Sequence, residues 1–295
     1  MNTLTVVFLI LIGFTAEQTP PPQSPVPADA APEKVAGGFQ FTEGITVDPN
    51  NNLFFSDIPA GLIYRITPQG IVSKFMQVDN TNGLQADKDG SIVACESQGD
   101  RRLIRIMPNK EILVLADGFD GKPFNSLNDL WIDPKGGVYI TDPRYGSREN
   151  MFQDGEHVYY VTPDRKVIRV IDDFIRPNGI IGTPNGQTLY VADLASGKTW
   201  KYDVELDGTL SGKTLFCSEG SDGMTIDDGG NVYLTVSGLK SVRIYSPSGA
   251  LLDSIKLPEG PTNVCFGDAD RKTLYITARS SIYKIPLLTR GVGSN

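Results

Sequence analysis

The sequence predicts an all-β protein, a six-bladed β-propeller with four-stranded blades whose N-terminal strand closes the last blade. Two observations lead to this prediction. A short motif, in which a polar residue is followed five positions later by an acid or a hydroxyl residue, occurs six times at intervals of 39 to 50 residues. Each copy then continues into β-rich runs separated by turn residues. A period near 40 is typical of radially repeated units.

The six motifs share an oxygen-bearing first residue, which we call the opener. The openers are Glu43 (EGITVD), Asn82 (NGLQAD), Asn128 (NDLWID), Asn178 (NGIIGT), Asp222 (DGMTID) and Asn263 (NVCFGD). A unit of this length cannot bury its apolar faces alone, so neighbouring units must pack on one another. If the units close into a ring, the six openers converge on one axis.

Two further runs in every unit are short, branched and aromatic, and are bounded by Gly, Asn, Asp or Pro. Such runs indicate buried strands. The first runs span 53–57, 92–96, 138–142, 189–193, 232–236 and 274–278, and the second runs span 63–68, 103–108, 158–163, 199–204, 242–247 and 282–287. Turns such as Pro68-Gln69-Gly70 lead to a fourth strand, for example 71–76 or 167–172.

The two ends of the repeat region predict how the ring closes. The sixth unit stops near Leu288 without a fourth strand, and the strand-like segment Val35–Phe41 precedes the first opener. We predict that this segment pairs with the sixth blade, because pairing hides two exposed strand edges. The alternatives are a β-sandwich or an open solenoid, but a solenoid would need capping repeats that the sequence does not show.

The sequence before the repeats predicts two further segments. Residues 1–16 contain an 11-residue apolar run, Leu4 to Phe14, that is too short to span a bilayer and is typical of a signal peptide. No Lys or Arg precedes the run and the cleavage site is poor, so an uncleaved anchor is the alternative. Residues 17–34 are rich in Pro and Ala and predict a disordered spacer, which leaves 35–295 as the propeller. We therefore expect a secreted or periplasmic protein without a transmembrane domain.

The amino-acid composition excludes several classes of functional site. The chain has 27 basic and 35 acidic residues, a net charge of −8, which argues against nucleic-acid binding. Its single histidine, His157, argues against catalytic triads and multi-histidine metal sites. The three cysteines lack metal-ligand spacing, and whether Cys217 and Cys265 form a disulfide stays open. Carboxylates, amides and hydroxyls must therefore carry the function. The oligomeric state is not predicted.

The predicted ring consists of two acids and four asparagines. An all-oxygen ring suits Ca²⁺ better than Mg²⁺, and Zn²⁺ would prefer nitrogen or sulfur. If four openers bind a Ca²⁺ that takes about 6 to 8 ligands, roughly 2 to 4 positions stay open for water or substrate. The alternative is that the openers only cap turns. Glu43 favours a cation, because its longer carboxylate is a poor turn mimic and is costly to bury without a counter-ion.

These residues resemble the SMP-30/gluconolactonase/luciferin-regenerating enzyme family of six-bladed propellers. The similarity covers about residues 38–288, and its most specific stretches are NSLNDLWIDPKGGVYITDPRYG (125–146), RPNGI (176–180) and SDGMTID (221–227). The resemblance implies an axial divalent cation, usually Ca²⁺, with Zn²⁺, Mg²⁺ or Mn²⁺ as alternatives. It also implies that the ligands are Glu43, Asn128, Asn178 and Asp222. Two positions depart from the family pattern: Leu127 stands where bacterial members often have Pro, and Ser126 where the vertebrate branch has a substrate-contacting Arg.

The resemblance implies a calcium-dependent hydrolase of a sugar lactone, similar to a gluconolactonase. The metal would polarise the lactone carbonyl, and Asp222 or Asp129 would activate water as a general base. Asp129 could instead orient the adjacent ligand. Candidate substrate contacts are Asn82, Glu96, Arg144, Tyr145 and Asn263.

Two structural alternatives and two functional alternatives stay open. Glu96 could pair with Arg101 or Arg102, and Arg144 and Tyr145 could pack a loop. The same metal site could act on esters or phosphotriesters, or the propeller could bind a ligand or a protein without catalysis. A purely binding propeller has no need of an ion with open coordination positions, which favours the hydrolase.

Overall fold

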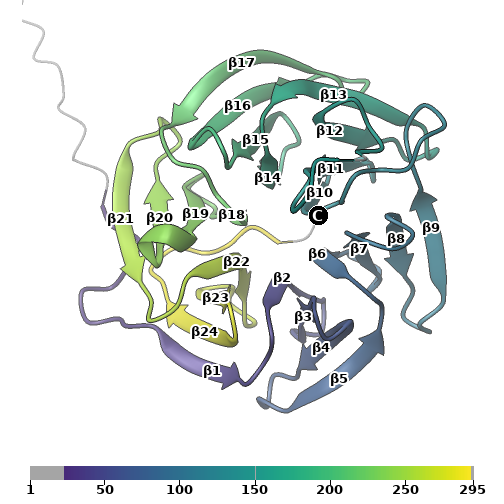
Figure 1. Ribbon diagram of the computed structural model, residues 1–295. Helices are drawn as coiled ribbons and strands as arrows, with labels where there is room; N and C mark the ends of the chain where they lie inside the picture. Colours follow the sequence, from purple (N-terminus) through teal and green to yellow (C-terminus); the bar gives the residue numbers. More distant parts are fainter. Residues whose placement is uncertain (1–22, 150, 294–295) are drawn as a thin grey trace, which may run out of the picture.

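In the computed structural model, which describes residues 23–149 and 151–293, six antiparallel sheets of four strands surround a central axis (Figure 1). The predicted fold class is confirmed. One strand of each sheet lies nearest the axis. These innermost strands are β2 (Thr42–Val47), β6 (Thr81–Ala86), β10 (Leu130–Ile132), β14 (Pro177–Gly182), β18 (Met224–Ile226) and β22 (Pro261–Gly267).

The remaining strands follow outward in each blade. The second strands are β3 (Leu53–Asp57), β7 (Ile92–Glu96), β11 (Val138–Asp142), β15 (Thr188–Asp193), β19 (Val232–Val236) and β23 (Thr273–Ala278). The third strands are β4 (Leu62–Ile66), β8 (Leu103–Ile106), β12 (Glu156–Val161), β16 (Lys198–Val204), β20 (Ser241–Tyr245) and β24 (Ser281–Pro286). The outer strands of the first five blades are β5 (Val72–Gln77), β9 (Ile112–Ala116), β13 (Val167–Phe174), β17 (Leu210–Cys217) and β21 (Leu251–Lys256). A short 3₁₀ helix, Ser237–Leu239, follows β19.

The N-terminal strand closes the ring as predicted. Strand β1 (Glu33–Gly37) pairs antiparallel with β24 and forms the outer strand of the sixth blade. It begins two residues earlier than expected and ends at Gly37, because Gly38 adopts a φ of +92° and turns the chain away. The Phe39 ring then packs against Phe55, at 4.9 Å between centroids. Closure therefore depends on noncovalent pairing between the two ends of the chain.

Part of the expected spacer is packed rather than disordered. Val26 and Ala30 pack against the apolar cluster between the fifth and sixth blades, and Leu288 N donates a hydrogen bond to Pro25 O at 2.8 Å. These apolar and backbone contacts hold residues 23–32 on the propeller, so the folded part begins earlier than position 35. The predicted signal peptide, residues 1–16, lies outside the described residues.

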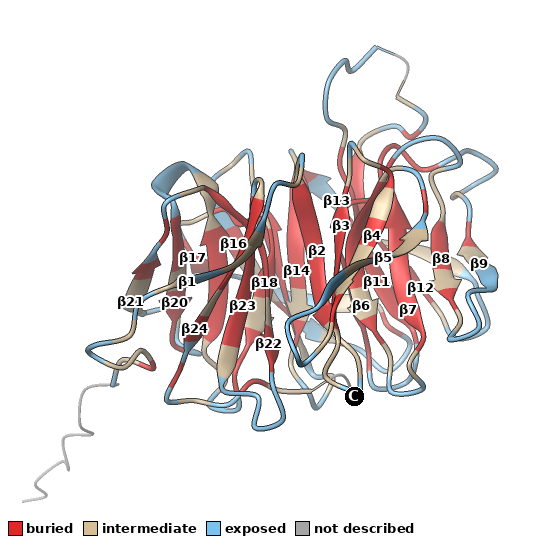
Figure 2. Cartoon of the chain, turned by 90° about the horizontal axis from the view of Figure 1, so that it is seen from below, coloured by how far each residue is buried: buried red, intermediate tan, exposed pale blue. Residues whose placement is uncertain are grey.

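The hydrophobic core lies between neighbouring blades. For example, Val93 and Leu103 of the second blade share one buried cluster with Leu130, Ile140 and Tyr159 of the third. Figure 2 shows the same pattern around the ring, with buried strands inside and exposed loops at both ends. Each fully buried apolar side chain stabilises the fold by roughly 1.5–3 kcal/mol. The packing between blades fixes the positions of the innermost strands relative to one another.

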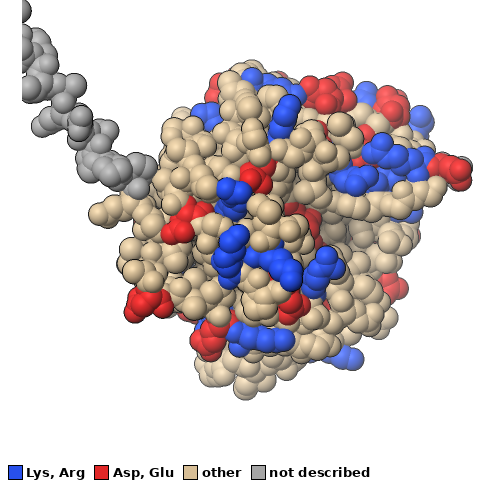
Figure 3. All heavy atoms as spheres, turned by 60° about the vertical axis from the view of Figure 1, so that its left-hand side comes forward, with Lys and Arg blue, Asp and Glu red and all other residues tan. Residues whose placement is uncertain are grey.

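Three further features concern possible membrane helices, the surface charge and the cysteines. No helix within the described residues has the length and apolarity needed to cross a membrane. On the face shown in Figure 3, acidic and basic side chains are interspersed. The three cysteines are free thiols.

Candidate active site on the propeller axis

Each opener lies where its sheet is irregular. The ladder between β2 and β3 shifts register between Glu43 and Thr46, and similar shifts occur at the openers of the second, fourth and sixth blades. In the third and fifth blades, Asn128 and Asp222 precede the innermost strand by two residues. A bulge or a strand end re-aims a side chain away from the regular alternation of the sheet. The openers can therefore point to the axis while their strands continue into the core.

Glycine follows four of the openers because neighbouring openers approach closely. A Cβ atom at Gly83 would lie 2.6 Å from the backbone oxygen of Asn128, and one at Gly44 would lie 2.1 Å from that of Asn82. Gly179 and Gly223 make similar approaches to the next blade. Only glycine allows such contacts without displacing the backbone. In the third blade Asp129 occupies this position and brings a carboxylate to the ring.

The Asn178 amide links two blades and the β11–β12 connection. Its Nδ2 donates to Asp222 Oδ1 at 2.7 Å and to the Tyr145 hydroxyl at 2.6 Å. Both amide hydrogens are used in this way, and Asn178 Oδ1 is buried without a hydrogen-bond partner among the residues that the structure describes. An unsatisfied buried acceptor costs about 1–3 kcal/mol. A cation bound at Oδ1 would remove that cost, so the donor set fits a metal ion.

Three carboxylates are buried close to this amide. Burial raises the pKa of Glu43 well above its usual range, and the nearby Asp222 raises it further. Burial also raises the pKa of Asp129 to about 7 and that of Asp222 to about 6. Within residues 23–149 and 151–293, none of the three forms a salt bridge with Lys, Arg or His. A ring of buried acids without basic partners favours a bound positive charge.

Three predicted substrate contacts also lie at the ring. Asn263 is buried and its side chain lowers the pKa of both Glu43 and Asp129, which places it between the two carboxylates. Asn82 is buried at the start of β6, where its backbone oxygen accepts a hydrogen bond from Ser56. Tyr145 reaches the ring through its hydroxyl.

The other two predicted substrate contacts are held by neighbouring residues. Glu96 binds Arg102 through both carboxylate oxygens, at 2.7 and 3.1 Å. It occupies the last position of β7, and the equivalent Asp142 of β11 accepts two backbone N–H bonds from the segment before its opener. Arg144 donates to the backbone oxygens of Ser147 and Asn125. Substrate contact by Glu96 and Arg144 stays a prediction.

A set of residues that support the ring was missed by the sequence reasoning. The hydroxyls of Thr141, Thr235 and Thr277 accept backbone N–H bonds at 2.7–3.0 Å from the residue at or directly after an opener. All three occupy the same position of their second strands, where Ser56 of the first blade also stands. An alignment of the six predicted second strands would have revealed this column of hydroxyl residues.

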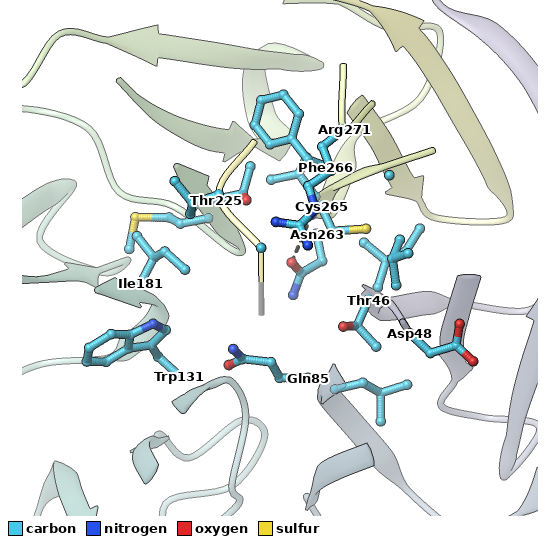
Figure 4. A pocket seen from close by; sticks show the side chains of 18 of the residues that line it. Thr46, Asp48, Gln85, Trp131, Ile181, Thr225, Asn263, Cys265, Phe266 and Arg271 are labelled. Atoms are coloured by element: carbon cyan, nitrogen blue, oxygen red, sulfur yellow. Dashed lines mark hydrogen bonds between the residues drawn. The ribbon is translucent and has the colours of Figure 1, made fainter. Parts of the chain in front are cut away.

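A cavity of about 310 Å³ lies beyond the ring along the innermost strands. Asp129 lines it. Asn263, Trp131, Gln85 and Thr46 line it as well (Figure 4). The C-terminal residues Val292 and Gly293 also line it. The segment before them is anchored by hydrogen bonds from Asp228 N to Arg290 O at 2.7 Å and from Gly291 N to Arg271 O at 2.8 Å. Figure 2 places the β11–β12 connection, which carries Tyr145, at the opposite end of the propeller.

The chemistry of the predicted metal ligands differs from that of a carboxylate and histidine cluster. Among the residues that the structure describes, no three or more His, Cys, Asp or Glu form a group that could hold a metal ion. The predicted set contains only two residues of these types, Glu43 and Asp222, and takes its other oxygens from Asn128 and Asn178. The amide oxygens are therefore essential to the predicted site.

Comparison with known proteins identifies the family. The sequence model of one protein family, the SMP-30/gluconolactonase/LRE-like region, matches residues 41–280 of this chain. The chain belongs to this family. The resemblance inferred from the sequence motifs is thus confirmed, and the matched region runs from the segment before the first opener to the start of β24.

Three SMP-30/gluconolactonase/LRE-like relatives illustrate the similarity. A gluconolactonase of Zymomonas mobilis is 30% identical, over 88% of this chain and 82% of the relative. Lactonase drp35 of Staphylococcus epidermidis is 27% identical, over 75% of this chain and 70% of the relative. The solved structure of XC5397, a gluconolactonase from Xanthomonas campestris, superimposes with a TM-score of 0.80 at 26% identity and covers 88% of this chain and 90% of that one.

Proposed function

We propose that this protein is a lactone hydrolase that uses a divalent cation on the propeller axis. The relatives named gluconolactonase and lactonase support lactone hydrolysis. The observation that supports a bound cation is that, within the described part of the chain, Asn178 Oδ1 is buried and unpaired beside carboxylates that have no basic partner. The proposed ligands are Glu43, Asn128, Asn178 and Asp222. We propose that the bound ion is Ca²⁺, because a set of oxygen ligands with two negative charges suits it. The alternatives are Mg²⁺, Mn²⁺ and Zn²⁺.

The proposed reaction adds water across the ring ester. When bound, the cation supplies Lewis-acid polarisation of the lactone carbonyl. Asp222, or alternatively Asp129, accepts a proton from water as the water oxygen bonds to the carbonyl carbon. The ring carbon–oxygen bond then breaks, and the released ring oxygen takes the proton back from the same aspartate to give the open hydroxy acid. Asp222 Oδ1 is held by Asn178, which fixes the orientation of this carboxylate.

The substrate contacts follow from the positions of the remaining ring residues. Asn263 and Tyr145 present an amide and a hydroxyl group beside the proposed ligands, and such groups suit the hydroxyls of a sugar lactone. We propose the same role for the amide of Asn82, the opener of the second blade. The Glu96 side chain is engaged by Arg102, and the Arg144 side chain by backbone oxygens of Ser147 and Asn125. We propose that they contact only the part of a substrate that extends from the ring.

Hydrolysis of δ-gluconolactone, followed as acid release, tests the proposal. The wild-type protein should hydrolyse the lactone, lose activity with a chelator and regain it with added Ca²⁺. A series of divalent ions at equal concentration would identify the preferred metal. Asp222→Ala should abolish turnover, because it removes a proposed ligand and base. Asp207→Ala is the matched control, since Asp207 is a fully exposed acid on the turn before β17 and should be dispensable.

Three outcomes would contradict this proposal in different ways. Lactone hydrolysis that survives complete removal of divalent ions would exclude the metal-dependent reaction. Faster cleavage of organophosphates or simple esters than of any lactone would assign the site to that chemistry. Saturable lactone binding without turnover would favour a binding propeller.

We also propose that the protein is exported. The 11-residue apolar run from Leu4 to Phe14 followed by a Pro/Ala-rich segment supports this proposal. Fractionation of expressing cells, with mass spectrometry of the N-terminus, would distinguish a cleaved signal peptide from a retained anchor. Intact protein confined to the cytoplasm would contradict it.

A further inference from the structure

Tyr145 contacts the proposed metal site from outside the propeller blades. It lies in the connection between β11 and β12, three residues after the end of β11, and 42% of the residue is exposed. Its hydroxyl nevertheless lies 2.6 Å from Asn178 Nδ2. Burial raises the pKa of Tyr145, and the nearby Asp222 and Glu43 carboxylates raise it further. The hydroxyl therefore lies close to the proposed ligands.

The amide of Asn178 has two orientations that differ by an exchange of oxygen and nitrogen. Only the orientation with Oδ1 toward the other ring oxygens can bind a cation. Asp222 and the Tyr145 oxygen both act as acceptors, and together they engage both hydrogens of the amide. Either acceptor alone would leave one N–H unpaired in a buried place, which costs about 1–3 kcal/mol. The Asp222 carboxylate can only accept and so selects the orientation that leaves Oδ1 free, while the Tyr145 oxygen satisfies the second N–H and holds the amide in that orientation.

A second contact fixes the position of the tyrosine ring. The Arg176 guanidinium carbon lies 5.1 Å from the centroid of the Tyr145 ring, within the range of a cation–π interaction. Arg176 precedes the innermost strand that carries Asn178, so the ring is held by the same blade that it supports. Arg144, the residue before Tyr145, also anchors the connection through backbone oxygens.

We propose that Tyr145 is a positioning residue for the axial cation: its hydroxyl oxygen accepts a hydrogen bond from Asn178 and so fixes the amide with Oδ1 directed at the ion. This inference rests on the proposed function, because it presupposes a cation on the axis. It assigns Tyr145 a role in metal affinity that is separate from contact with substrate.

Calcium binding in the absence of substrate, measured by isothermal titration calorimetry, tests this role. Tyr145→Phe removes the acceptor and keeps the ring, and we expect its Kd for Ca²⁺ to rise about 10-fold, as is typical when a group that orients a ligand is lost. Tyr283→Phe is the matched control. Its hydroxyl donates to Glu259 at 2.9 Å in the sixth blade, and the variant should bind Ca²⁺ as the wild type does.

A double-mutant cycle separates orientation of the amide from general weakening of the site. Asn178→Asp places two equivalent oxygens at this position, so no orientation has to be selected. In the Asn178→Asp background, Tyr145→Phe should change the Kd by less than 2-fold. Strong coupling between the two positions is the signature of a direct contact. Thermal unfolding in chelator would confirm that each variant is folded.

The outcomes distinguish this inference from the proposed function. A wild-type protein that binds no divalent ion would refute the axial cation and with it both proposals. A wild-type protein that binds Ca²⁺, with Tyr145→Phe binding it equally well, would refute only the role of Tyr145. The same refutation follows if Tyr145→Phe weakens binding to the same extent with Asn178 and with Asp at position 178.

Discussion

At the scale of single residues, the site is made from common short polar side chains. An isolated Asn-Gly pair is more typical of a turn than of a metal site. Asn178 and Asn82 are both followed by Gly and both open their repeats, yet the unpaired amide oxygen is found at Asn178. The difference comes from the neighbouring Asp222 and Tyr145, which use both hydrogens of the Asn178 amide.

The close approach between openers gives a prediction for Gly83→Ala. The added Cβ would meet Asn128 O at 2.6 Å and Asp129 Cα at 2.8 Å, and backbone atoms of the next blade cannot rotate away. We expect the unfolding free energy to fall by about 1–3 kcal/mol, as for other overpacked sites. Calcium affinity should fall as well, because Asn128 is displaced. Denaturant unfolding and calorimetry would measure the two effects.

Gly238→Ala provides the control for that substitution. Gly238 lies in the 3₁₀ helix after β19, and an added Cβ would meet no atom within 4 Å. This variant should keep the stability and calcium affinity of the wild type. Equal stability of the Gly83 and Gly238 variants would show that the ring tolerates the extra atom.

At the scale of elements, the strands were predictable because turn residues bound short apolar runs. The predicted runs 53–57, 92–96, 138–142 and 232–236 coincide with β3, β7, β11 and β19. The register shifts at Glu43 and the other openers were not predictable, because a bulge depends on pairing with a second strand rather than on local sequence. The packing of residues 23–32 was missed for a similar reason, since Val26 finds its partners in the last two blades.

The closing strand β1 supports a prediction for truncated chains. A chain that begins at Gly38 lacks β1 and exposes the edge of β24, whereas one that begins at Pro32 keeps β1 and loses the packing of Val26 and Ala30 and the hydrogen bonds made by Ser24 and Pro25. Each lost pairing hydrogen bond contributes about 0.5–1.5 kcal/mol. The shorter chain should therefore unfold at a markedly lower temperature and bind Ca²⁺ more weakly. Equal melting temperatures of the two chains would show that β1 contributes little to closure.

At the scale of the whole molecule, the buried carboxylates predict how stability depends on pH. Without a cation, the pKa of Asp129 is about 7 and that of Asp222 about 6, both above the ordinary 3.8. A raised pKa in the folded state contributes stability that is full below about pH 4 and is lost as the pH rises through about 6 to 7. In chelator, the unfolding free energy should therefore decrease from about pH 4 to about pH 7.

Saturating Ca²⁺ should remove most of this decrease, because the ion compensates the charge of the ionised carboxylates. Denaturant unfolding at a series of pH values, with and without Ca²⁺, measures the difference. Asp142 is a useful internal reference: burial raises its pKa to about 7 as well, and it should leave a residual slope in both conditions. Identical pH profiles with and without Ca²⁺ would contradict a cation beside Asp129 and Asp222.

The arrangement of the whole molecule was more predictable than the detailed site. Six motifs in register were enough to place the openers on one axis, because closure of the ring makes equivalent positions neighbours. The contact between Tyr145 and Asn178 could not be predicted, since it joins the β11–β12 connection to another blade. Glu96 was predicted to contact substrate, with a pair to Arg101 or Arg102 as the alternative; its carboxylate at the end of β7 forms a salt bridge with Arg102, and substrate contact stays a prediction.

The C-terminal segment affects how substrate can reach the axial site and how product can leave it. Val292 and Gly293 line the cavity beyond the ring, so the C-terminal segment narrows the axial space at that end. We therefore expect substrate to enter, and product to leave, at the opposite end of the axis, which carries Tyr145. The acid released by one turnover should occupy the place that the next lactone needs, and product inhibition should accordingly be competitive.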